Sequence, residues 1–142
     1  MIQKVRDDFS RHNKEYLNSR RKLMRRLARL SRTFFAEKNF AAQGFITGPG
    51  KVIKWKKRKF NVDPGRPILI KTGNMKNSIR IVSATSHKAK ILSPVPYSAK
   101  HNLGLGNLPA RPFMAASPEL DRQCRKVIKE HVDKIFNVGL KR

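Results

Sequence analysis

The chain has 142 residues, of which 39% are hydrophobic and 30% charged, a composition typical of globular proteins that excludes a largely disordered chain. This length suits one domain spanning residues 1–142. The 33 Lys and Arg residues outnumber the nine Asp and Glu residues and give a formal net charge of +24. Because such an excess repels itself unless anions balance it, we expect a nucleic acid or an acidic protein surface as a partner.

Cysteine content and hydropathy indicate the compartment and the cofactors. The single cysteine, Cys124, excludes an internal disulfide and a cysteine-based zinc site. No stretch approaches the roughly 20 apolar residues that span a bilayer. We therefore expect a soluble protein made in a reducing cytoplasm, with no membrane partner and no cofactor or metal.

Residues 8–37 have the pattern of one long amphipathic helix. Apolar residues recur there at intervals of three, four and seven, with no Pro or Gly between them: Phe9, Tyr16, Leu23, Leu27, Leu30 and Phe34. At about 100° per residue, a second set, called the basic arc, falls on the opposite side: Arg21, Lys22, Arg25, Arg26, Arg29 and Arg32. A charge run is usually a solvated face, but this density favours contact with DNA phosphates or an acidic partner.

Residues 43–67 interrupt the helical pattern with several Gly and Pro residues, which predicts a long loop or a hairpin. Such a segment is uncommon in a compact domain unless it is functional or disordered. Its basic residues are further candidates for contact with DNA or an acidic partner: Lys54, Lys56, Lys57, Arg58 and Lys59. Trp55 lies among them and could stack on a base, although a lone Trp does not establish base recognition.

The second half of the chain predicts a small antiparallel sheet followed by a helix. Short strand patterns occur at residues 68–70, 78–83 and 88–93. Between the first two strands, residues 71–74 indicate a turn or the start of a helix, with Thr72 or Asn74 available as an N-cap. A helix is expected at residues 118–137, with Ser117 as its N-cap and Gly139 at its C-terminal end.

The predicted fold class is α+β: a small antiparallel β-sheet with a long N-terminal helix and a C-terminal helix packed on it, plus the long basic loop or hairpin. The expected core draws on apolar residues of all three parts: Leu27, Leu30, Phe34, Ile79, Ile81, Ile91, Val127, Ile128 and Ile135.

Three stretches carry a resemblance to a known family. Residues 68–79 read ILIKTGNMKNSI, residues 95–104 read VPYSAKHNLG, and residues 109–114 read PARPFM before a Ser-Pro-Glu helix start. Together they resemble the phage virion-morphogenesis family, the Mu-like tail-completion proteins, whose segments read Thr-Gly-x-Leu-x-x-Ser-Ile, Pro-Tyr-Ala-x-x-His-x-x-Gly and Ala-Arg-Pro-Phe. Met75 stands where the family has Leu, and Ser98 where it has Ala. The likeness covers about residues 40–136 and leaves most of the N-terminal helix outside it.

The resemblance implies a structural virion protein of a tailed bacteriophage, either a tail completion or tail terminator protein or a neck component that joins heads to tails. It implies a homo-oligomeric ring, a hexamer, with tail tube and neck or connector proteins as neighbours and double-stranded DNA as a further candidate partner. Such a protein would be located in the virion and assembled in the host cytoplasm. The candidate assembly residues are those of the motifs: Thr72, Gly73, Ser78, Tyr97, His101, Gly104, Arg111, Pro112 and Phe113.

Physical chemistry assigns structural roles to two of these residues. Phe113 would be a hydrophobic plug, and Arg111 a planar donor to backbone carbonyls or a carboxylate, within the domain or across subunits. The acidic residues and histidines lack the arrangement of a catalytic or metal site. We therefore expect no enzymatic activity. Composition alone would equally support a free, sequence-independent nucleic-acid-binding protein of ribosomal or nucleoid type.

Overall fold

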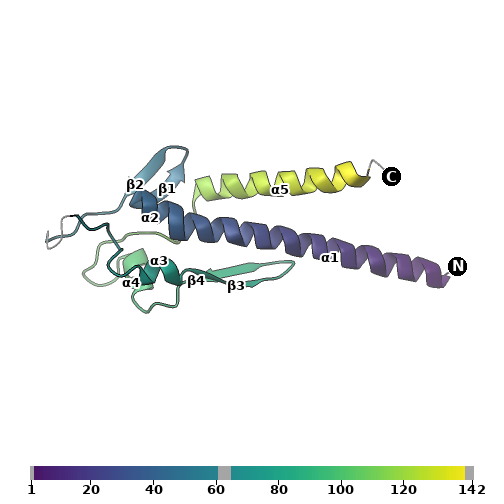
Figure 1. Ribbon diagram of the computed structural model, residues 1–142, viewed down its shortest axis with the longest axis horizontal. Coiled ribbons are helices and arrows are strands. Elements are labelled where there is room, and N and C mark those ends of the chain that lie inside the picture. The colour runs from purple at the N-terminus through teal and green to yellow at the C-terminus, as the bar shows by residue number, and fades with distance from the viewer. Residues whose placement is uncertain (1, 61–64, 140–142) are drawn as a thin grey trace.

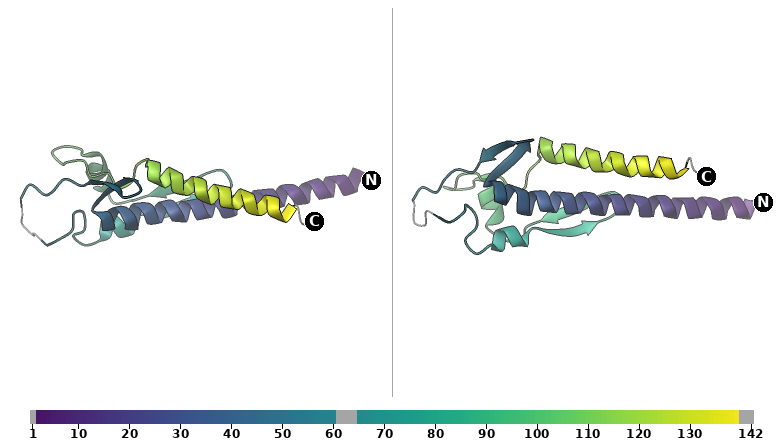
Figure 2. Two further views of the ribbon diagram at one scale, coloured as in Figure 1. Left: turned by 90° about the horizontal axis from the view of Figure 1, so that it is seen from above. Right: turned by 45° about the horizontal axis from the view of Figure 1, so that its top comes forward.

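The computed structural model describes residues 2–60 and 65–139, and its two longest elements are antiparallel helices that lie side by side (Figures 1 and 2). Helix α1 (Ile2–Thr33) continues through a π-helical turn (Phe34–Lys38) into α2 (Asn39–Ala42). The helical segment is therefore longer at both ends than the predicted 8–37. It stops at Gln43, which adopts a left-handed conformation with φ of 50°.

The next segment is a hairpin, one of the two predicted alternatives. Strand β1 (Gly44–Gly48) pairs antiparallel with β2 (Lys51–Lys54), and Gly50 supplies the positive φ of 68° in the turn between them. Gly44 is required by close packing, because a Cβ there would lie 2.5 Å from the carbonyl oxygen of Ile53. The hairpin packs against α2 and against the start of α5 (Pro118–Gly139).

A second hairpin runs along α1 on the side away from α5 (Figure 1). It consists of β3 (Arg80–Ala84) and β4 (Ala89–Leu92), which confirms the two predicted strands to within two residues. The predicted strand at residues 68–70 is wrong. Leu69 has a left-handed φ of 63°, which is incompatible with an extended ladder, and residues 68–70 pack on the core as an irregular segment. Across residues 2–60 and 65–139, the strands therefore form two separate two-stranded sheets in place of the predicted single one.

The described part of the second half also contains the helices α3 (Asn74–Ser78), α4 (Ser98–Leu103) and α5. The hydroxyl oxygen of Thr72 accepts a hydrogen bond from the backbone N–H of Asn74 at 3.4 Å, at the start of α3. The predicted N-cap of α5 is confirmed, since the Ser117 hydroxyl oxygen accepts the N–H of Leu120 at 3.3 Å. The capping role predicted for Gly139 involves residues outside those that the structure describes.

The main core lies where α2, the β1–β2 hairpin, α3 and the segment before α5 meet. Its buried members are Ala36, Phe40, Trp55, Met75, Ile79 and Phe113. Of the predicted core, Phe34 and Ile79 are fully buried, and five residues are half-buried: Leu27, Leu30, Ile81, Ile91 and Val127.

Two of the expected core positions are wrong, because Ile128 and Ile135 are exposed. The face of α5 that carries Leu120, Cys124 and Val127 is turned toward the interior, and the two isoleucines lie on its flank. Within the part of the chain described, no helix combines the length and apolar character needed to cross a membrane.

Candidate functional site

The three motif segments, which are far apart in the sequence, meet around one open pocket of about 500 Å³. Thr72 and Gly73 line it from the first segment, Tyr97 and His101 from the second, and Arg111 from the third. We call this region the motif junction. Its formation depends on the packing of α3, α4 and residues 109–114 onto one another.

Arg111 is the buried centre of the motif junction, with 6% of its surface exposed. Its Nε donates to the carbonyl oxygen of Lys56 at 2.9 Å, and a terminal nitrogen donates to that of Lys57 at 3.3 Å. Burial and then the charge of Arg58 lower the pKa of this guanidinium. The predicted role as a planar donor to backbone carbonyls is thus met within the same chain.

Phe113 is the predicted hydrophobic plug and is 1% exposed. Its ring packs edge-on against Phe40 with the centroids 5.6 Å apart. Phe40 in turn contacts Trp55, whose indole N–H donates to the carbonyl oxygen of Pro112 at 2.7 Å. Trp55 is therefore a buried core residue, and the prediction that it could stack on a base is wrong.

Two asparagines that the sequence reasoning missed hold the segment around Phe113. Asn39 is fully buried and donates to the carbonyl oxygen of Phe113 at 3.0 Å, while its own oxygen accepts the N–H of Ile46 at 3.2 Å. Asn102 accepts the N–H groups of Phe113 and Met114 at 2.8 and 2.9 Å. The available signal was weak: Asn39 is a poor helix former inside a helical run.

Ser78 takes part in a chain of hydroxyl groups. Its oxygen lies 2.6 Å from that of Ser93, which lies 2.5 Å from that of Ser98, so α3, the end of β4 and α4 are linked. Ser98 is buried, and its hydroxyl has a hydrogen-bond partner in this chain of hydroxyl groups, as buried polar groups generally do.

The remaining motif residues also have conformational or packing roles. Gly104 has a φ of 72°, and a Cβ there would lie 2.6 Å from the backbone nitrogen of Ala110. Gly73, with a φ of 77°, immediately precedes α3. Tyr97 is partly exposed, and its ring meets the edge of His101 at a centroid distance of 6.1 Å.

The surroundings of His101 disfavour a positive charge on its imidazole. Its Nδ1 is buried without a hydrogen-bond partner, and burial followed by the charge of Arg111 lowers its pKa. None of the described residues that line the pocket is an acid. The geometry thus pairs this imidazole with no carboxylate that could orient it as a general base.

The basic arc is divided by the tertiary structure. Arg26 pairs with Glu130 at 3.2 Å. Arg32 pairs with Glu37 at 3.0 Å and donates to the carbonyl oxygen of Ile79. The other four members are exposed and have no carboxylate within ion-pair distance among the described residues; we call them the outer arc: Arg21, Lys22, Arg25 and Arg29.

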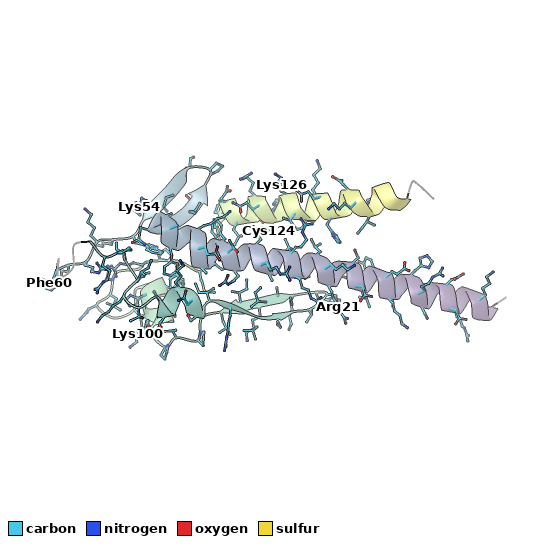
Figure 3. All side chains as sticks on the ribbon, in the orientation of Figure 1. Arg21, Lys54, Phe60, Lys100, Cys124 and Lys126 are labelled. Atoms are coloured by element: carbon cyan, nitrogen blue, oxygen red, sulfur yellow. The ribbon has the colours of Figure 1, made fainter. Side chains whose placement is uncertain are left out.

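The second basic group is at the far side of the core. Lys54 on β2 and Arg21 on α1 lie at different positions along the long axis of the molecule (Figure 3). Four lysines of this group are exposed: Lys54, Lys56, Lys57 and Lys59. Arg58 is half-buried and donates to the carbonyl oxygens of Arg66 and Pro67 at 2.9 and 2.7 Å, so part of its guanidinium is engaged within the chain, and its role as an outward contact stays a prediction.

Within residues 2–60 and 65–139, His, Cys, Asp and Glu side chains form no group of three or more that could hold a metal ion. Cys124 is half-buried, and burial raises the pKa of its thiol, so it is a poor nucleophile at neutral pH. Comparison with family models, with curated proteins and with solved structures found no match to this chain.

Proposed function

We propose that this chain is a structural, non-enzymatic component of a tailed bacteriophage particle: a tail completion, tail terminator or neck protein that forms a ring and joins heads to tails. The observation that carries the proposal is the motif junction. The three segments that resemble the virion-morphogenesis family are the ones that pack together, and their residues serve as plug, carbonyl donor and turn. A set of motif residues with packing roles suits an assembly protein better than an enzyme.

The charge supports a second part of the proposal, contact with the genome near the head–tail joint. The outer arc and the exposed lysines of the β1–β2 region offer cations that form no ion pair with a carboxylate among the residues that the structure describes, which suits sequence-independent binding to phosphates. The same surfaces would serve the alternative function, a free nucleic-acid-binding protein. The two functions differ in what the loss of the protein does to phage particles.

The decisive experiment inactivates the gene in its phage and examines the lysate by electron microscopy. We expect unjoined heads and tails, rescued by the wild-type protein supplied from a plasmid, and detection of the protein in purified particles. Arg111→Lys is the variant to supply in the same rescue experiment, because it alters the motif junction. The single nitrogen of an ammonium cannot donate to both carbonyl oxygens in the fork geometry of a guanidinium. Normal particles without the protein, together with its recovery on host nucleic acid, would favour the alternative.

A further inference from the structure

Near the N-terminal end of α1 and the C-terminal end of α5, large apolar side chains remain exposed among the described residues. On α1, Phe9 is 74% exposed and Tyr16 is 59% exposed. On α5, four apolar residues are at least 39% exposed: Ile128, Val132, Ile135 and Phe136. These α5 residues follow the spacing of four, three and one that places them on one flank of the helix.

The register of the helices brings the two sets together. The Ser19 hydroxyl and the His131 Nε2 are 2.9 Å apart. Because the helices are antiparallel, residues after His131 on α5 lie beside residues before Ser19 on α1 (Figures 1 and 2). Tyr16 is about one turn before Ser19 and Ile135 about one turn after His131, so both lie at the same level. We call the six exposed apolar residues the helix-tip surface.

The helix-tip surface is large enough for a specific contact. The exposed fraction of each side chain can be multiplied by the full area of that side chain, which is about 150–250 Å² for an aromatic residue. Summed over the six residues, this gives roughly 600 Å² of exposed apolar surface. A standard protein interface buries about 800 Å² per partner, and a monomer seldom exposes apolar patches beyond a few hundred Å². The projecting part of α1 also gains stability from a partner, since an isolated helix of about 15 residues is marginal in water.

The distribution of charge identifies the partner. Residues 2–18 and 126–142 contain five of the nine acidic residues but only nine of the 33 basic residues. The rest of the chain therefore holds 24 basic and four acidic residues and repels a second copy of itself. The helix tips have the lowest excess of positive charge, so they are where two copies can approach at the lowest electrostatic cost. The acids and exposed aliphatic groups there suit a polyanion such as DNA poorly.

We propose that the helix-tip surface is the contact between copies of this chain, with the α1 end of one copy packed on the apolar flank of another. This inference rests on one part of the proposed function, that copies of the chain form a ring. It adds the surface through which neighbouring subunits of that ring meet. The motif junction is then internal to each subunit, and the outer arc stays free for DNA.

The test replaces the two most exposed residues of the surface, Phe9→Ser together with Phe136→Ser. Both side chains lie outside the core, so we expect the fold to persist. The matched control is Leu103→Ser with Leu105→Ser, which removes two exposed leucines at the other end of the molecule. By light scattering, the wild type and the control should be oligomers, and the tip variant should fall to the 16.3 kDa of one chain.

Amide hydrogen exchange gives a second readout that does not depend on the symmetry of the assembly. In the wild type, protection of residues 4–18 should rise with protein concentration, and in the tip variant it should stay low at every concentration. The β1–β2 hairpin serves as the internal control and should be equally protected in both proteins. Lost hairpin protection in the tip variant would report misfolding, and the wild type would then decide: protection of residues 4–18 that does not change with concentration would overturn the contact.

The outcomes separate the contact from the proposed function. If the tip variant forms an oligomer of the same mass as the wild type, the proposed contact is overturned. The contact is also overturned if the wild type stays monomeric and is nevertheless required for head–tail joining. In both cases the virion role stands. Conversely, an oligomer that dissociates in the tip variant, from a protein whose loss leaves particles normal, would retain the contact and overturn the virion role.

Discussion

Replacement of three outer-arc arginines by Gln should weaken the salt dependence of DNA binding by a calculable amount. Arg21, Arg25 and Arg29 are exposed and lack carboxylate partners among the described residues. Each phosphate contact contributes about 0.9 to the slope of log affinity against log salt, so the triple change should lower the slope by about 2.7. Over a fourfold rise in salt, the wild type should lose about 40-fold more affinity than the variant. Gln has nearly the helix propensity of Arg, so α1 should remain intact.

The assay is fluorescence anisotropy with a duplex of random sequence between 50 and 200 mM salt. The control removes the same charge from three arginines that are ion-paired with carboxylates at 2.8 to 3.4 Å: Arg11, Arg26 and Arg125. Because these guanidiniums are already neutralised, the control slope should change much less. An outer-arc variant that keeps the wild-type slope would refute the reasoning that this face contacts DNA.

Further predictions concern stability. Phe113→Ala should cost about 3–5 kcal/mol by urea unfolding, because it empties a buried aromatic site, whereas Leu105→Ala at an exposed position should cost under about 0.5 kcal/mol. The lowered pKa of His101 means that the folded state disfavours its protonation, so the free energy of unfolding should fall as pH drops below 6.5. His101→Gln should flatten this part of the curve of stability against pH. A curve that is unchanged in the variant would contradict the prediction. Hydrogen bonds from Arg122 and Gln123 lower the pKa of Glu119 from 4.5 to about 2, so its contribution to stability is present above pH 4.5 and lost toward pH 2; Glu119→Gln should remove that acid-sensitive part in thermal melts at pH 2 to 5.

Local patterns in the sequence predicted the elements that depend on local physics. The apolar period of α1, the Ser-Pro-Glu start of α5 and the alternation in β3 are properties of neighbouring residues, and all three elements are present. Ser117 caps α5 because a hydroxyl before a helix start can reach the first free N–H groups whatever the rest of the chain does. Net charge likewise needs no structure, and it directs attention to anionic partners.

Only the tertiary structure decided which of these residues are available. Trp55 and Arg58 have the sequence setting of a basic surface run, yet Trp55 is buried with its indole N–H bonded to the carbonyl oxygen of Pro112, and Arg58 is half-buried and bonded to the carbonyl oxygens of Arg66 and Pro67. In the basic arc, Arg26 pairs with Glu130 of α5, and Arg32 pairs with the nearby Glu37 and donates to the carbonyl oxygen of Ile79. Ile128 and Ile135 belong to an apolar pattern that predicted core, but α1 is narrow and covers only one face of α5, which leaves their flank open. Periodicity gives the direction of a side chain around its own helix, and burial depends on which neighbour, in this chain or another copy, is placed there.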